Sequence, residues 1–128
     1  AGHALETLSG LSMLHGVAVA LGMRLDARLG EILGLTAVGT AERLDSVLSA
    51  CGLPLELDSD LTIRRILEAA GSDKKARQGA VRWSLPARIG AAARTASGEW
   101  THAIDTATCE SELGAALRTA ADVPDSPA

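Results

Sequence analysis

The chain of 128 residues contains neither phenylalanine nor tyrosine, and its only aromatic side chains are Trp83 and Trp100. A protein with two aromatic residues has no platform on which successive bases can stack, which argues against single-stranded nucleic acid as a partner. Hydrophobic residues still make up 47% of the chain. The core must therefore be built from Leu, Ile, Val and Ala, and the abundance of Ala and Leu favours helices.

An excess of positive charge is also missing. The 12 basic residues are outnumbered by 16 acidic ones, which gives a net charge of −4. Without a basic patch to attract the phosphate backbone, we expect no nucleic-acid partner.

Long apolar runs and targeting signals are absent as well. No run approaches the roughly 20 residues that span a bilayer, and the first residues do not form a secretory signal with a basic start. We therefore expect a cytoplasmic protein with no membrane partner. The two cysteines, Cys51 and Cys109, form no CxxC pattern, so we expect buried thiols and no disulfide.

The pattern of apolar residues predicts a mainly α fold, a helical bundle-like domain with a short C-terminal β-hairpin or small sheet. One domain over residues 1–121 and a flexible tail over 122–128 are expected. Helices are expected over residues 2–8, 15–33, 41–51, 61–70 and 110–121, with a charged connector over 72–79. A strand over 80–85 is expected to find partners in 89–95 and 100–104.

Two helices carry apolar residues at spacings of three and four, which predicts their buried faces. In the second helix the buried face is expected to contain Leu14, Ala18, Leu21, Leu25, Leu29 and Ile32. In the third it is expected to contain Leu44, Val47, Leu48 and Cys51. Thr40 and Asp60 are expected to cap the third and fourth helices.

Three histidines are the first candidates for chemistry, because a neutral imidazole binds zinc and titrates near neutral pH. His3 and His15 are 12 residues apart on either side of a turn, while His102 lies near the C-terminus. From the residues alone, each is more simply a packed or surface side chain. The chain contains no GxGxxG motif and no P-loop.

Residues 2–23 read GHALETLSGLSMLHGVAVALGM. This stretch resembles the signature of the 3-dehydroquinate synthase family of sugar phosphate cyclases, GHTxGHAIE followed by LHGEAVAxGM. The resemblance implies the C-terminal helical domain of that family. It places His15 at a zinc-ligand position and His3 at the substrate, as a catalytic residue in phosphate-linked proton transfer. Glu6 completes the first motif and is interpreted as structural, and Val17 replaces the glutamate of HGE.

A second stretch fits the same family in the expected order. Asp73, Lys74 and Lys75 precede a strand and then Ile89-Gly90, which resembles the family's DKK, strand, IG arrangement. The resemblance implies that Lys74, with Lys75 beside it, binds the substrate phosphate, and an ammonium group suits that task as a point charge. Taken alone, the run would be a solvated charged loop.

The resemblance implies an enzyme whose equipment is incomplete in this chain. Members of the family cyclise a seven-carbon sugar acid phosphate with NAD and zinc, whereas this chain contains no NAD fold and only one of three zinc-ligand positions. No cofactor is expected in this chain alone, and zinc and NAD are expected only if a partner domain supplies the rest of the site.

Three interpretations remain open. The chain is one half of a cyclase completed by a nucleotide-binding partner domain, and acts on a small-molecule substrate. Alternatively, it is a stand-alone domain of natural-product biosynthesis that binds an apolar molecule and promotes its cyclisation without metal or NAD. The third is a non-catalytic interaction module. Because an interface is left over once the nucleotide domain is missing, a homo-oligomer is expected.

Overall fold

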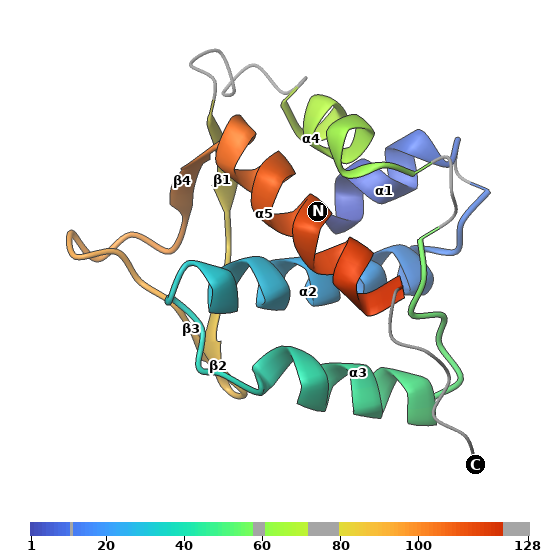
Figure 1. Ribbon diagram of the computed structural model, residues 1–128, viewed down its shortest axis with the longest axis horizontal. Helices are drawn as coiled ribbons and strands as arrows, with labels where there is room; N and C mark the ends of the chain where they lie inside the picture. Colours follow the sequence, from blue (N-terminus) through green and yellow to red (C-terminus); the bar gives the residue numbers. More distant parts are fainter. Residues whose placement is uncertain (11, 58–60, 72–79, 122–128) are drawn as a thin grey trace.

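The computed structural model describes residues 1–10, 12–57, 61–71 and 80–121. Five helices and four short strands lie within these ranges (Figure 1). The helices are α1 (Gly2–Leu8), α2 (His15–Ile32), α3 (Thr40–Ala50), α4 (Ile63–Gly71) and α5 (Thr106–Ala121). The strands are β1 (Ala80–Trp83), β2 (Pro86–Arg88), β3 (Ala91–Ala92) and β4 (His102–Asp105). The expected mainly α fold with a small sheet is confirmed.

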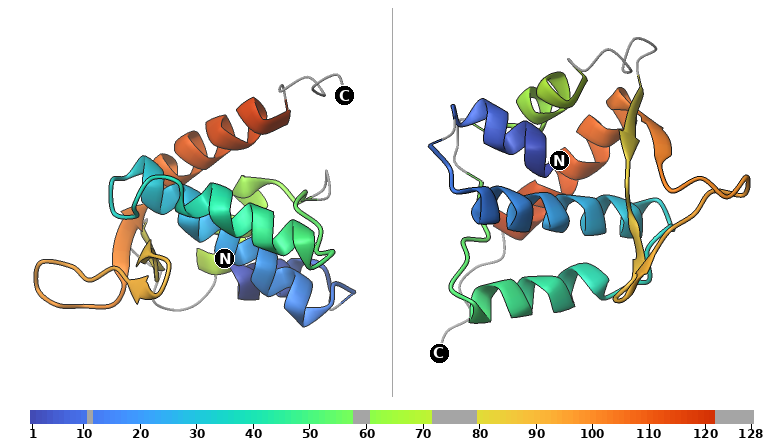
Figure 2. Two further views of the ribbon diagram at one scale, coloured as in Figure 1. Left: turned by 90° about the horizontal axis from the view of Figure 1, so that it is seen from below. Right: turned by 180° about the vertical axis from the view of Figure 1, so that it is seen from behind.

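Helix α2 is the central element, and α1, α3 and α5 all pack against it (Figures 1 and 2). The prediction of its buried face is confirmed along the middle of the helix, where Leu21, Leu25 and Leu29 are buried. It is wrong at the two ends, because Leu14 is 76% exposed and Ile32 is also exposed. Both residues lie at the ends of the helix, so a continuous apolar stripe overestimates how much of the helix is buried.

Helices α1 and α2 cross at closely approaching backbones. A Cβ atom built on Gly22 would lie 2.4 Å from the backbone nitrogen of Gly2, well inside van der Waals contact. Only glycine allows this crossing, which brings the N-terminal part of α1 onto α2.

Helix α3 lies along one side of α2 and packs against it (Figure 1). Of its predicted buried face, Leu48 is buried and Leu44 is half-buried, whereas Val47 and Cys51 are exposed. The prediction of a buried Cys51 is therefore wrong, while both cysteines are free thiols as expected.

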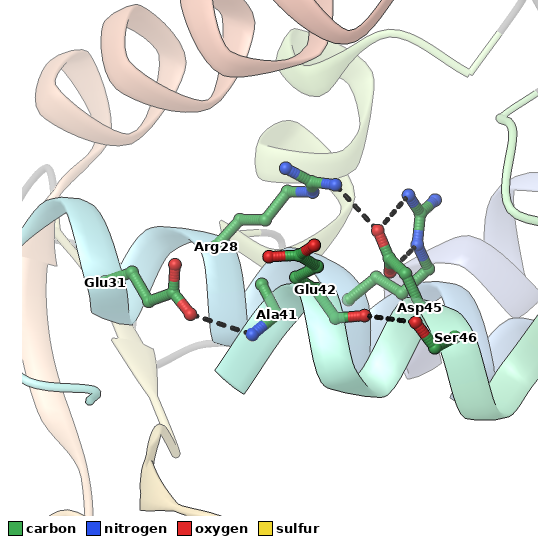
Figure 3. A network of polar contacts seen from close by, with 7 residues as sticks. Arg28, Glu31, Ala41, Glu42, Asp45 and Ser46 are labelled. Carbon is green, nitrogen blue, oxygen red and sulfur yellow. Dashed lines mark hydrogen bonds and ion pairs between the residues drawn. The ribbon is translucent and has the colours of Figure 1, made fainter. Parts of the chain in front are cut away.

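The start of α3 is capped differently from the expectation. Thr40 is the first helical residue, and its hydroxyl donates to the carbonyl of Ala37. The cap comes from α2: the backbone N–H of Ala41 donates to Glu31 Oε1 at 2.8 Å (Figure 3). A carboxylate at a helix N-terminus also complements the helix dipole.

A second polar contact joins the same two helices. Asp45 on α3 accepts hydrogen bonds from Arg24 and Arg28 on α2, the latter at 2.7 Å (Figure 3). Partial burial raises the pKa of Asp45, but the hydrogen bonds and charges of the two guanidinium groups outweigh that effect and hold the pKa below its ordinary value. Ion pairs between side chains, together with the buried side chain of Leu48, thus hold α3 against α2.

The strands form two small antiparallel pairs, β1 with β4 and β2 with β3. In the first pair Val81 lies opposite Ile104 and Trp83 opposite His102, so these side chains share the face that points to the core. The strand expected over 80–85 is present as β1, and its predicted partner over 100–104 is present as β4. The prediction that residues 89–95 also pair with it is wrong, because β3 pairs with β2 in a separate sheet. Pro86 is the first residue of β2.

The last two helices begin at residues other than those expected. Helix α4 begins at Ile63, and the hydroxyl of Thr62 accepts the N–H of Arg65 as its cap; Asp60 lies outside the described residues. Helix α5 begins at Thr106, four residues before the predicted start at Glu110. Asp105 caps it by accepting hydrogen bonds from the N–H and the hydroxyl of Thr108.

The helices α1, α2, α4 and α5 and strand β1 contribute to one cluster of buried side chains, which includes Leu5, Leu29, Ile66, Trp83 and Leu113. Within the described ranges, none of the helices is both long and apolar enough to cross a membrane. The predicted tail over 122–128 is outside the part of the chain that the structure describes.

Candidate functional site

The two histidines of the N-terminal motif are carried by α1 and by the first residue of α2. Both are exposed, and His15 keeps 76% of its side-chain surface in contact with solvent. His3 and Glu6 are three residues apart on α1, so they lie on the same side of that helix. Glu6 also contacts His15 at the start of α2, so it is the residue of the first motif that joins the two helices.

The side chains of Glu6 and His15 are in direct contact. Glu6 Oε2 lies 3.2 Å from His15 Nδ1, and only 23% of the Glu6 side chain is exposed. The interpretation of Glu6 as a brace within the first motif had not included this partner.

The turn between the two helices is held by Ser9. Its hydroxyl donates to the carbonyl of Glu6 at 2.8 Å and accepts the N–H of Met13 at 3.3 Å. Met13 is two residues before His15, so one side chain ties the last turn of α1 to the approach to α2. Glu6 and His15 are thereby held at a fixed separation by the backbone on both sides.

Val17, in place of the expected glutamate, is half-buried and packs against the core cluster. It therefore contributes to packing beneath the start of α2. Since a carboxylate at this position could have oriented a metal ligand, the valine leaves Glu6 as the acid in contact with His15.

A half-buried carboxylate lies near the start of α1. Asp26 on α2 is 3.8 Å from the ammonium group of Ala1. Burial raises the pKa of Asp26 to about 6, and the nearby ammonium group partly offsets this effect.

The donor set does not fit a metal ion by itself. Among the described residues no group of three His, Cys, Asp or Glu side chains is placed to hold one, whereas a catalytic zinc needs three protein ligands. His102 does not add to the site, because it lies on β4, on the other side of the molecule from α1 (Figure 1). Both of its ring nitrogens are buried without a hydrogen-bond partner among the described residues.

The predicted phosphate-binding residues, Lys74 and Lys75, lie outside the described residues. Their roles stay predictions, as do those of His3 and His15. Trp83, Cys109 and the buried side of His102 form part of the core, and burial raises the pKa of the Cys109 thiol to about 11.

The surface beside His15 is apolar. Val19 and Met23 follow His15 along α2 at intervals of four, which places all three on one side of the helix. Both are exposed, at 39% and 45%, and Leu14 precedes them. We call Leu14, Val19 and Met23 the α2 stripe.

Comparison with known proteins extends the resemblance in residues 2–23. The sequence profile of the family described as "3-dehydroquinate synthase C-terminal" matches residues 1–76. The 3-dehydroquinate synthase of Picosynechococcus sp. is 39% identical over 90 residues, which are 70% of this chain and 25% of that protein. The corresponding enzyme of Dehalococcoides mccartyi is 44% identical over 91 residues, or 71% of this chain and 25% of its own. The chain thus spans about a quarter of the length of these curated relatives.

A solved structure shows the same fold. The crystal structure of 2-deoxy-scyllo-inosose synthase in complex with carbaglucose-6-phosphate, NAD+ and Co2+ superposes with a TM-score of 0.74 at 17% identity. The match covers 88% of this chain and 30% of that one.

Proposed function

The chain belongs to the 3-dehydroquinate synthase C-terminal family, and from that premise we propose that it acts as the helical half of a sugar phosphate cyclase. A nucleotide-binding domain would complete the active site. The observation that carries the proposal is the contact of the exposed His15 with Glu6 at the start of α2, in a chain that spans 25% of the length of its relative.

The exposed apolar α2 stripe supports the proposal that a second domain completes the active site. Leu14, Val19 and Met23 are exposed directly beside His15, and apolar side chains gathered at a polar site are typical of an interface. The three quarters of the relatives' length that this chain does not match are long enough to form a second domain. We therefore place the nucleotide-binding domain against this stripe, in a cytoplasmic enzyme that forms a homo-oligomer.

Each site residue has one role in this proposal. His3 lies beside the substrate and exchanges a proton with its phosphate, while Lys74 and Lys75 attract that phosphate as point charges. His15 contributes a single metal-ligand position. The described residues make no metal group by themselves, and in this proposal the partner domain supplies NAD and the remaining metal ligands.

Complementation tests the proposal. The chain is mixed with the separately produced N-terminal part of the Picosynechococcus enzyme, and phosphate release from the seven-carbon sugar acid phosphate is followed. We expect release only when both parts, NAD and a divalent metal are present. His15→Ala should reduce the rate by at least about a hundredfold, because ligand loss removes most metal affinity. Val19→Asp should weaken the association of the two parts.

Arg43→Ala is the matched control, since Arg43 is exposed on α3, away from His15, and should leave the rate unchanged. Phosphate release that persists in chelator and without NAD would contradict the proposal. It would favour the stand-alone cyclase of natural-product biosynthesis instead. Failure of the two parts to associate, together with no turnover, would favour the interaction module.

A further inference from the structure

The contact between Glu6 and His15 involves one particular ring nitrogen. The carboxylate oxygen is 3.2 Å from Nδ1, and the other ring nitrogen, Nε2, lies on the far edge of the imidazole. Because most of the His15 side chain is exposed, Nε2 faces outward from the protein.

An ionised carboxylate only accepts hydrogen bonds, and a neutral imidazole has one donor nitrogen and one acceptor nitrogen. The hydrogen bond with Glu6 therefore requires the proton of His15 to be on Nδ1. In that tautomer Nε2 keeps its lone pair. Such a carboxylate–histidine arrangement commonly fixes which nitrogen binds a ligand.

The two partners differ in how firmly they are held. Glu6 is the more buried of the two. It lies in the last turn of α1, which the Ser9 side chain connects to the residues that precede α2. The imidazole is on the outer surface of α2 and gains its orientation from the acid. The direction of control thus runs from Glu6 to His15.

We propose that Glu6 is a positioning residue for His15: it holds the imidazole in the Nδ1–H tautomer and presents Nε2, as an electron-pair donor, toward the face where the partner domain binds. The identity of the group that Nε2 meets rests on the proposed function, whereas the tautomer does not. Glu6 thereby orients the His15 imidazole, which the apolar side chain of Val17 cannot do.

Nitrogen-15 NMR of the histidine rings tests this in the chain alone, at about pH 9, where imidazoles are neutral. We expect His15 to be mainly the Nδ1–H tautomer. Glu6→Ala should shift the tautomer ratio toward Nε2–H by about fivefold, the size typical of one exposed charged contact. Glu6→Gln, whose amide oxygen still accepts a hydrogen bond, should shift it less.

Glu42→Ala, which removes an exposed acid from α3, should leave the His15 signals unchanged, and the His102 signals report whether each variant remains folded. A wild-type His15 that is mainly Nε2–H, or a ratio that Glu6→Ala does not change in a folded chain, would overturn the proposal. Complementation is measured separately from the tautomer ratio. Turnover without a dominant Nδ1–H tautomer would contradict only the role of Glu6. A dominant Nδ1–H tautomer without turnover would contradict only the proposed function.

Discussion

At the scale of single residues, the two cysteines differ in a way that chemistry can measure. Cys109 is fully buried, and burial raises the pKa of its thiol to about 11, with the Asp105 carboxylate acting in the same direction. A thiol reacts as its thiolate, so Cys109 is both inaccessible and protonated at pH 8. Cys51 is exposed at the end of α3.

We therefore expect iodoacetamide to alkylate one thiol per folded chain at pH 8 and two after denaturation, as counted by mass spectrometry. Cys51→Ser should abolish labelling of the folded chain, and Cys109→Ser should leave it unchanged. Rapid labelling of Cys109 under native conditions would contradict the buried environment described for it.

The residues of the site were predictable to different degrees. The motif in residues 2–23 predicts His3 and His15 as site residues from their spacing along the chain, and their roles stay predictions. The contact of Glu6 with His15 was not predictable in the same way, because it depends on the path of the turn that Ser9 fixes. Motif spacing predicts which residues belong to a site. Which of them contact one another, as Glu6 and His15 do across nine positions, is known only from the three-dimensional structure.

At the scale of elements, the contact between α2 and α3 depends on Asp45. Two guanidinium groups converge on this carboxylate, and its replacement by an amide would remove their counter-charge and one of the two acceptor oxygens. We expect Asp45→Asn to lower the free energy of unfolding by about 1–2 kcal/mol at pH 7, less than for a fully buried pair because solvent screens it. Urea unfolding measures this value.

The pH dependence follows from the lowered pKa of Asp45. The carboxylate stabilises the folded chain above the pKa of an unfolded aspartate, about 4, and that contribution is lost as the pH falls through the lower folded value. The difference between wild type and Asp45→Asn should therefore shrink progressively below about pH 4. Ser46→Ala, on the exposed side of α3, serves as the control, and a difference independent of pH would contradict the ionic account.

Element boundaries were predicted well where glycine or polar residues end a helix, as for α1 and α2, and less well where the cap is supplied from elsewhere. The early start of α5 was missed, although Asp105 followed by Thr108 is a capping pattern that the sequence contains. The start of α3 was predicted to within one residue, but its cap could not be predicted locally, because the acceptor, Glu31, belongs to another helix. The exposed Val47 shows the same limit: amphipathic spacing predicts an apolar face but not which neighbour covers it.

At the scale of the whole molecule, one core joins elements from both ends of the chain. Leu5 from α1, Trp83 from β1 and Leu113 from α5 belong to the same buried cluster, so the sheet cannot lose its packing while the helices keep theirs. The prediction that residues 1–121 form a single domain then has a direct consequence, because small domains with one core usually unfold in one cooperative step.

The two tryptophans make this step measurable. Trp83 is buried and Trp100 is 56% exposed, so Trp100→Phe leaves a fluorescence signal that reports only on the core side of β1. We expect the urea transition of this signal to coincide with that of helical circular dichroism. Leu29→Ala, which opens a cavity beneath α2, should lower both midpoints together, at a cost of about 2–5 kcal/mol. Separate midpoints would mean that the sheet and the helices unfold independently, and the single-domain prediction would then be wrong.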